Sequence, residues 1–297
     1  MREVRRIETP GAALHVEMRG AGSPVAVLHG FTGSARSMEG VARGLSAWHR
    51  TLAFDLVGHG RSEAPRDPAA YALPRCLSQL AAALDALGIP RAHLVGYSLG
   101  GRVALSFCAA RPERVRSALL VGASAGLEDP AARAARARED EALAREIELS
   151  GLPAFVERWM AQPLLASQEK LGAAFLARAR AERLAQRAHG LAQALRGLGT
   201  GAMPPLHAAL PGLRVPICLV AGAQDAKFAA LARELAGRLP DARAECLPGA
   251  GHAAHLEEPA AFLDLARRFF AEVEAREAPP RPAPETPPDA CTRTATP

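Results

Sequence analysis

Residues 93–110, His-Leu-Val-Gly-Tyr-Ser-Leu-Gly-Gly-Arg-Val-Ala-Leu-Ser-Phe-Cys-Ala-Ala, decide the fold. A short apolar run ends in Gly96-Tyr97-Ser98-Leu99-Gly100, and a helical pattern continues to Ala110. A G-x-S-x-G pentapeptide between a strand and a helix holds its serine on a sharp turn, and the glycines leave room for close packing. We therefore predict that Ser98 is the reactive group, and not only a cap for the helix that follows.

The apolar runs on either side of this motif predict a doubly wound sheet. Val4–Thr9 and Ala13–Met18 alternate around Pro10-Gly11, which predicts an antiparallel hairpin at a sheet edge. Short continuous apolar runs, typical of strands buried on both faces of a parallel sheet, lie at Val25–His29, Leu52–Asp55, His93–Tyr97, Ala118–Gly122, Ile217–Gly222 and Ala244–Leu247. Helical patterns lie between and after them, at Leu73–Leu87, Leu99–Ala110, Phe228–Leu239 and Ala260–Val273. This alternation predicts an α/β fold with a mostly parallel sheet.

One long stretch, from about Leu127 to Gly212, contains no strand pattern. Its helical patterns lie at Pro130–Glu148, Pro153–Met160 and Leu171–Leu195, and Asp129 is a natural N-cap for the first of them. A helical insertion at the carboxyl end of a strand would cover the crevice where open sheets bind ligands.

The chain is accordingly expected to have three parts. The α/β core comprises residues 1–126 and 213–277, and the helical cap comprises residues 127–212. Residues 278–297 are rich in Pro, Thr and Ala and nearly free of large apolar side chains, so we predict a disordered tail.

Two further residues are candidates to activate Ser98. In α/β hydrolases the order along the chain is nucleophile, acid, base, and His252, directly after the last strand, has the position of the base. His255 is the rival, but it lies nearer the final helix and is better explained as structural. Asp225 follows the strand Ile217–Gly222 and can orient the imidazole, whether or not it also caps the next helix. The loop after Ala118–Gly122 is the alternative source of the acid, but its carboxylates, Glu128 and Asp129, come too far along.

Backbone N–H groups that could stabilise an oxyanion are expected at two places. The loop His29-Gly30-Phe31 follows the first buried strand and supplies one donor in this fold, and the residue after the serine supplies the other. We assign these donors to Phe31 and Leu99. The turn from Asp55 to Ser62 is interpreted mainly as structural.

Composition excludes several other classes. The net charge is +5, but the arginines are spread over several helices among acidic residues, unlike the clustered basic face of a nucleic-acid-binding protein. No apolar run suits a signal peptide or a membrane span. The odd number of cysteines shows no framework spacing, so we expect a cytoplasmic protein. The histidines and cysteines form no metal signature, and neither a dinucleotide-binding glycine motif nor a P-loop is present, so neither metal nor cofactor is expected. The sequence indicates no oligomeric state.

The motifs together resemble a narrower family. The stretches around His29, Asp55, Ser98 and His252 are similar to α/β hydrolases in general. Three others resemble 2-succinyl-6-hydroxy-2,4-cyclohexadiene-1-carboxylate (SHCHC) synthase of menaquinone biosynthesis: Trp159 to Ser167 (WMAQPLLAS), Leu195 to Pro204 (LRGLGTGAMP) and Ala221 to Phe228 (AGAQDAKF). The resemblance covers nearly the whole chain except the tail. Val57, where such loops usually have proline, and the segment with Arg187 and His189 depart from the family pattern.

The resemblance implies a lyase that eliminates pyruvate from an enolpyruvyl cyclohexene carboxylate, with Ser98 acting as a base. It also implies that Tyr97, Arg102, Arg136, Trp159, Arg183 and Lys227 bind the substrate. The residues give independent support, because Arg102 lies one turn beyond Ser98 and arginine pairs bidentately with carboxylates. Arg138 is the alternative to Arg136 on the cap. A serine hydrolase of a carboxylated ester or carbon–carbon bond is the alternative activity, and a non-catalytic binding module is disfavoured by the intact set of Ser98, Asp225 and His252.

Overall fold

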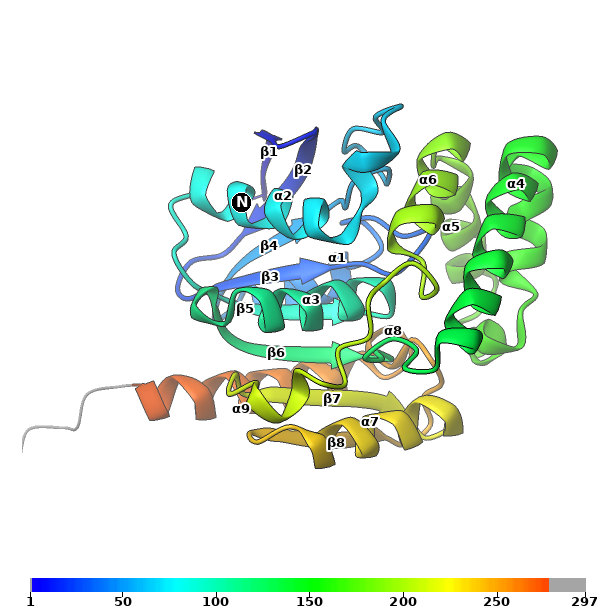
Figure 1. The fold of residues 1–297 in the computed structure, drawn as a ribbon. Helices are drawn as coiled ribbons and strands as arrows, with labels where there is room; N and C mark the ends of the chain where they lie inside the picture. The colour runs from blue at the N-terminus through cyan, green and yellow to red at the C-terminus, as the bar shows by residue number, and fades with distance from the viewer. Residues whose placement is uncertain (1, 278–297) are drawn as a thin grey trace, which may run out of the picture.

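The computed structural model describes residues 2–277 and contains one eight-stranded sheet (Figure 1). Its strands are β1 (Arg2–Thr9), β2 (Ala12–Arg19), β3 (Pro24–Leu28), β4 (Arg50–Phe54), β5 (Ala92–Tyr97), β6 (Val115–Val121), β7 (Ile217–Gly222) and β8 (Ala242–Leu247). Their order in space is β1-β2-β4-β3-β5-β6-β7-β8. The pairs β1–β2 and β2–β4 are antiparallel and the others are parallel. The predicted mostly parallel sheet with an antiparallel hairpin at its edge is therefore confirmed, and the predicted tail lies outside the described residues.

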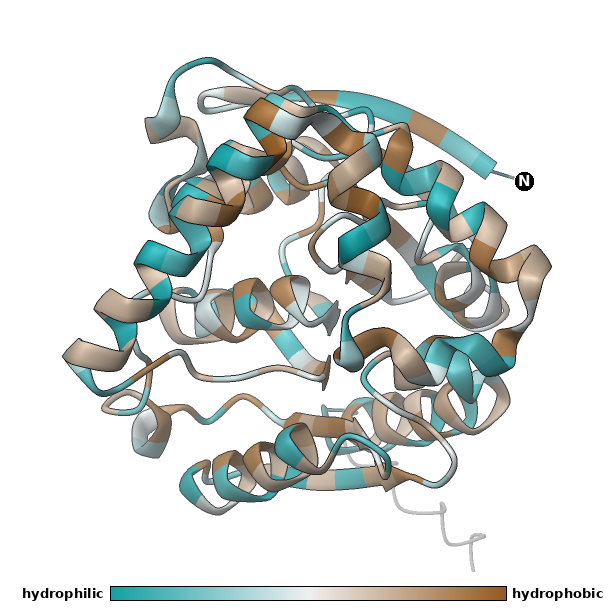
Figure 2. Cartoon of the chain, turned by 90° about the vertical axis from the view of Figure 1, so that its right-hand side faces the viewer, coloured by the Kyte–Doolittle hydropathy of each residue, from teal (hydrophilic) through white to brown (hydrophobic). Residues whose placement is uncertain are grey.

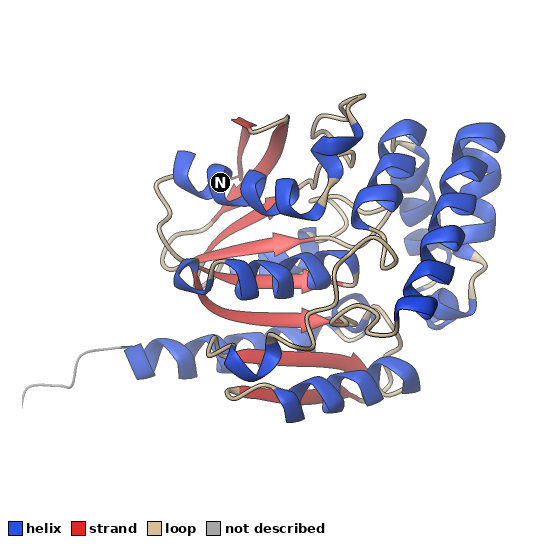
Figure 3. Cartoon of the chain, in the orientation of Figure 1, coloured by secondary structure: helices blue, strands red, loops and turns tan. Residues whose placement is uncertain are grey.

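Helices cover both faces of the sheet, as Figure 3 shows. One face carries α2 (Leu73–Ala86), α3 (Leu99–Ala110) and α7 (Ala226–Arg238), and the other carries α1 (Glu39–Leu45) and α9 (Pro259–Glu277). The short helix α8 (Ala254–Glu257) and three 3₁₀ turns, η1 (Pro68–Tyr71), η2 (Pro112–Arg114) and η4 (Leu210–Gly212), complete these layers. Two consecutive residues of β5 show why the buried strands appear in the sequence as unbroken apolar runs. Leu94 packs into one hydrophobic cluster and Val95 into the other, because successive side chains of a strand point to opposite faces.

The segment between β6 and β7 is helical and lies beyond the carboxyl ends of the strands, toward which the arrowheads point in Figure 1. It comprises α4 (Pro130–Met160), η3 (Pro163–Leu171), α5 (Ala173–Leu184) and α6 (Ala188–Leu198). Figure 2 shows hydrophilic and hydrophobic residues alternating along these helices. Apolar side chains of α4 and α6 are buried against each other, whereas α5 has no buried residue. The two helices expected at 130–148 and 153–160 are present as two helical segments of α4, separated by a kink at Gly151, whose φ of 74° and ψ of 170° are not helical.

The single helix expected over Leu171–Leu195 is wrong, because the chain breaks it between α5 and α6. Gln186 lies at the break, and its side chain donates hydrogen bonds to the carbonyls of Thr32 and Gly33 and accepts one from the Gly60 N–H. Arg187 takes an extended backbone conformation next to it. Anchoring of Gln186 to loops of the sheet thus turns a sequence with continuous helical character into two helices.

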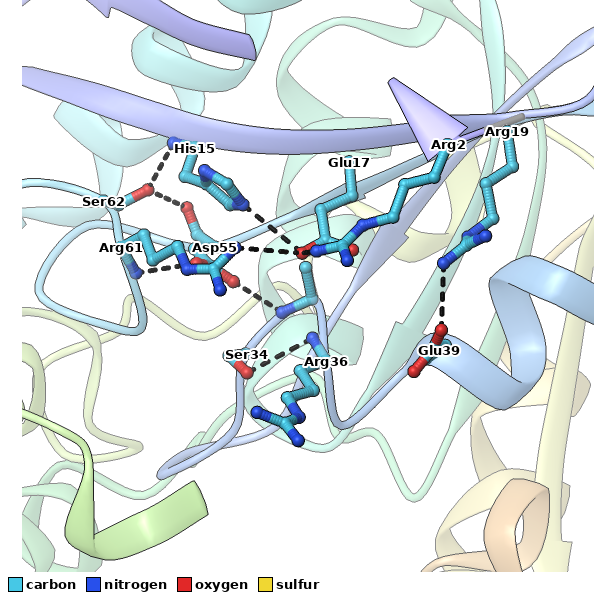
Figure 4. Close-up of polar contacts among 11 residues, drawn as sticks. Arg2, His15, Glu17, Arg19, Ser34, Arg36, Glu39, Asp55, Arg61 and Ser62 are labelled. Carbon is cyan, nitrogen blue, oxygen red and sulfur yellow. Dashed lines mark hydrogen bonds and ion pairs between the residues drawn. The ribbon is translucent and has the colours of Figure 1, made fainter. Parts of the chain in front are cut away.

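The turn after β4 is held together by its own polar groups (Figure 4). The Asp55 carboxylate accepts hydrogen bonds from the Ala35 N–H at 2.5 Å and the Arg61 N–H at 2.7 Å. The Ser62 hydroxyl donates to the Asp55 carbonyl at 2.5 Å and accepts from the His15 N–H at 2.7 Å. These contacts fit the structural interpretation of this turn.

Candidate active site

Ser98 lies at the junction of β5 and α3 in a strained backbone conformation. Its φ is 51° and its ψ is −107°, in the positive-φ region that side chains other than glycine rarely adopt. The glycines on both sides are required by close approach. A Cβ atom at Gly96 would lie 2.5 Å from the Gly100 carbonyl oxygen, and one at Gly100 would lie 2.4 Å from the Leu28 carbonyl oxygen. The sequence motif therefore corresponds to a real crowding of β3, β5 and α3 that projects Ser98 from the sheet.

Ser98, His252 and Asp225 form one hydrogen-bonded chain. The Ser98 hydroxyl oxygen lies 3.2 Å from His252 Nε2, and His252 Nδ1 lies 2.8 Å from an Asp225 carboxylate oxygen. The other Asp225 oxygen accepts from the Phe228 N–H at 3.2 Å, so Asp225 also caps α7. Burial raises the pKa of Asp225, but the hydrogen bonds from His252 and the Phe228 amide outweigh it and hold that pKa below its usual value. An ionised Asp225 can orient the imidazole and stabilise its protonated form.

Tight packing fixes the His252 ring. The rings of Phe228 and Tyr97 lie 4.5 Å and 5.4 Å from it, centroid to centroid. Gly122 backs the ring, since a Cβ atom there would lie only 2.7 Å from His252 Cε1.

The rival residues are placed elsewhere. His255 is buried against the Tyr97 ring at 4.5 Å, and burial, with His252 nearby, lowers its pKa to about 3. Asp129 caps α4 through the N–H groups of Ala131 and Ala132, and Glu128 lies 3.9 Å from Arg238. None of these three is hydrogen-bonded to Ser98 or His252 within residues 2–277.

A cavity of about 500 Å³ opens over Ser98, and we call it the active cavity. Ser98, Leu99, Arg102, His252 and Lys227 reach it from the sheet and its flanking helices, while Arg136, Trp159 and Arg183 reach it from α4 and α5. Every residue expected at the site lines this cavity except Asp225, which lies behind His252: the lining includes Phe31, Tyr97, Ser98, Leu99, Arg102, Arg136, Trp159, Arg183, Lys227 and His252. Arg138, the alternative to Arg136, does not line it.

Two cationic side chains of the cavity, Arg102 and Arg136, are held by polar partners that the sequence did not predict. Arg102 donates to the Thr200 hydroxyl at 2.6 Å, and Arg136 donates to Asp140 at 2.7 Å. Burial lowers the pKa of Arg102 to about 10, and the nearby charge of Arg136 adds to this, so Arg102 stays protonated at neutral pH. The i,i+4 spacing could have revealed Asp140, whereas Thr200 lies too far from Arg102 in the chain for any local signal.

The two residues expected to donate to an oxyanion, Phe31 and Leu99, both reach the active cavity. Neither N–H has an acceptor within residues 2–277. The Phe31 ring meets Trp159 edge-on at 5.2 Å, which joins this loop to α4. Backbone N–H groups without another acceptor can stabilise a developing oxyanion.

Residues 2–277 hold no group of three or more His, Cys, Asp or Glu side chains arranged for a metal ion. No helix in that range has the length and apolar character needed to cross a bilayer.

Fold and site together define the class. The family described as alpha/beta hydrolase fold matches residues 23–259, so the chain has the fold expected from the elbow at Ser98.

Similar proteins show to which family within this class the chain belongs. A putative SHCHC synthase from Bacillus subtilis is 38% identical over 253 residues, which is 85% of this chain and 92% of the relative. SHCHC synthase from Serratia proteamaculans is 34% identical over 244 residues, 82% of this chain and 91% of the relative. Among solved structures, MenH from S. aureus superposes with a TM-score of 0.84 at 28% identity and covers 87% of this chain and 98% of its own. The chain belongs to the SHCHC synthase family of enzymes, which confirms the resemblance seen in its motifs.

Proposed function

We propose that the protein eliminates pyruvate from 2-succinyl-5-enolpyruvyl-6-hydroxy-3-cyclohexene-1-carboxylate and forms SHCHC, a step of menaquinone biosynthesis. The observation that carries this proposal is the hydrogen-bonded Ser98–His252 pair inside a cavity lined by arginine and lysine, in a chain of this family. A substrate with several carboxylates suits such a lining, because guanidinium groups bind carboxylates bidentately.

In this mechanism Ser98 is a base. His252 accepts the hydroxyl proton of Ser98 while the serine oxygen removes a proton from a ring carbon, and Asp225 stabilises the resulting imidazolium. The electron pair of the broken C–H bond moves through the ring, and the bond to the enolpyruvyl oxygen breaks in a 2,5-elimination. The leaving group departs as enolpyruvate, takes up at carbon the proton that the His252 imidazolium gives back, directly or through water, and becomes pyruvate. The ring is left as a cyclohexadiene and His252 is neutral again.

The negative charge that develops on the succinyl ketone oxygen needs stabilisation. We assign this role to the N–H groups of Phe31 and Leu99, supported by their place in the cavity and their lack of other acceptors within residues 2–277. Arg102, Arg136 and Lys227 then hold carboxylates, Tyr97 and Trp159 provide apolar walls, and Arg183 contributes a further cation from α5.

We also propose that the core and the inserted helices have different roles. Residues 1–126 and 213–277 form the core that carries the reactive groups, and residues 127–212 form a cap that closes over the substrate. A cytoplasmic location is also proposed, supported by the free thiols of Cys76, Cys108, Cys218 and Cys246.

The test is direct. The purified protein is incubated with the enolpyruvyl precursor while pyruvate release and the absorbance of the conjugated diene are followed. We expect both signals to rise together, and Ser98→Ala to lower kcat by about 10²- to 10⁴-fold, the usual contribution of a positioned base. No pyruvate at micromolar enzyme would overturn the assignment.

A second measurement separates the base from a nucleophile. Intact-protein mass spectrometry during turnover should show only the free enzyme, since a base forms no covalent bond to substrate. An adduct on Ser98 would instead favour covalent catalysis.

A further inference from the structure

A second cavity, of about 430 Å³, shares a wall with the active cavity. Phe31, Tyr97 and Arg183 line both of them. The second cavity lies between α1 and α5, and His255 and Leu256 of α8 contribute to its lining. We call it the side cavity. Beyond the shared wall, the proposed reaction gives the residues of the side cavity no role.

The charge in the side cavity is mainly positive. Its charged residues are Arg36, Arg43, Arg178, Arg183, Glu39 and Glu182. Figure 4 shows that Glu39 is engaged by Arg19, at 2.9 Å, and that Arg36 points away from the other residues drawn. Glu182 lies 3.4 Å from Arg36. The three remaining arginines have no carboxylate partner within residues 2–277.

Exposed arginines are common on protein surfaces and do not by themselves indicate a binding site. The buried part of this cavity is unusual, because it contains polar groups without partners. His255 is only 2% exposed, and neither ring nitrogen has a hydrogen-bond partner in the described part of the chain. The Nε of Arg183 is buried and unpartnered as well. Buried polar groups in native proteins nearly always have partners. Because burial lowers the pKa of His255 to about 3, its ring is neutral and offers one N–H donor and one acceptor.

Apolar groups complete the lining, with Phe31, Met38, Phe175 and Leu256 beside the polar ones. We propose that the side cavity is a second anion site, which binds a carboxylate carried on a small apolar or ring-shaped body next to the active cavity. The guanidinium groups of Arg43, Arg178 and Arg183 meet the carboxylate, and the apolar side chains meet the body. This site is independent of the proposed function, because it needs no turnover.

The test uses benzoate as the probe and ligand-observed NMR as the readout. Arg102→Gln is introduced first, to weaken anion binding in the active cavity. We expect the Arg102→Gln variant to bind benzoate. When Arg43→Gln and Arg178→Gln are added to it, the Kd for benzoate should rise about tenfold or more, a loss of about 1.4 kcal/mol in binding free energy. The matched control adds Arg145→Gln and Arg180→Gln, which remove the same charge from exposed arginines outside the cavity.

Three results would overturn the proposal. Loss of all benzoate binding in Arg102→Gln would place the anion in the active cavity alone. Equal weakening by the two double substitutions would show a general effect of net charge. Benzamide binding as tightly as benzoate would show that the carboxylate is not recognised. Because no result depends on pyruvate release, failure of this proposal and failure of the lyase assignment are distinguishable.

Discussion

Substitution of Gly122 by alanine should disable the enzyme without unfolding it. Gly122 follows β6 with a φ of 56° and lies against the imidazole of His252. The new methyl group would lie 2.7 Å from His252 Cε1 and 3.0 Å from Nδ1, whereas ordinary contacts begin at 3.4 Å. The ring must therefore retreat by about 0.7 Å, and it is already enclosed by Phe228 and Tyr97.

The size of the effect follows from this displacement. The Ser98–His252 contact is already 3.2 Å long, so a shift of this size removes it or misaligns it. Misplacement by about 1 Å can cost about 10²-fold in rate, and we expect a loss of that order in kcat. The backbone cost is separate, about 1 to 2 kcal/mol for alanine at positive φ.

Gly88→Ala provides the matched control. Gly88 has a φ of 68°, and a Cβ atom there would have nothing within 4 Å. Both variants should lose stability in thermal unfolding through the backbone cost, and Gly122→Ala should lose about 1 to 3 kcal/mol more because its methyl group overpacks the His252 ring. The change in Tm should be about 2 to 4 °C per kcal/mol for a chain of this size. Only Gly122→Ala should lose turnover in the pyruvate-release assay. Near-normal kcat in Gly122→Ala, or an equal loss in Gly88→Ala, would refute the reasoning.

Three further predictions concern the cavity and the stability of the fold. Arg102→Gln should lower kcat/KM by about 10- to 100-fold, since a charge-assisted hydrogen bond is lost, while Arg180→Gln on exposed α5 should leave it within about twofold. Glu17 is buried on β2, the strand next to the edge strand β1. Burial raises its pKa, but hydrogen bonds from Arg2 and His15 outweigh this and hold the pKa below its usual value. The contribution of ionised Glu17 to folding stability is therefore present at neutral pH and is lost as the pH falls through the lowered pKa. In urea unfolding, Glu17→Gln should be less stable than the unmodified protein by about 1 to 3 kcal/mol at pH 7. In acid the two proteins should be equally stable. Asp129→Ala should cost about 1 kcal/mol in the same experiment, because two N–H groups at the start of α4 lose their acceptor, and an unchanged midpoint would contradict this.

Most of the sheet could be predicted from the sequence, because strands buried on both faces leave unbroken apolar runs. The end of β5 at Tyr97 and the limits of β7 match the sequence pattern, and the other strands differ from it by a few residues at their ends. Short helices were missed, such as α1 and α8, whose few residues give too little periodicity to detect. The break at Gln186 was also missed, because it depends on carbonyl groups of Thr32 and Gly33 more than 150 residues away.

The residues expected at the site came within reach of one another because their positions are tied to strand ends. Ser98 follows β5, Asp225 follows β7 and His252 follows β8, and neighbouring strand ends meet at one edge of the sheet. Thr200, the hydrogen-bond partner of Arg102, does not follow a strand, so its position in the sequence gave no indication that it lies at the site. The side cavity could not be predicted from the sequence for the same reason, since only the tertiary fold brings Arg43 of α1 next to Arg178 and Arg183 of α5.

The active cavity has walls of two origins, and this has an evolutionary consequence. Ser98 and His252, which are proposed to move the proton, lie directly after strands of the sheet. Arg136, Trp159 and Arg183 lie on helices inserted between β6 and β7. Mutations in α4 and α5 can therefore alter which molecule fits without disturbing the hydrogen bonds at Ser98. Selection can act on ligand preference and on reactivity through different stretches of the gene, so a new substrate can be acquired before any change in the chemistry.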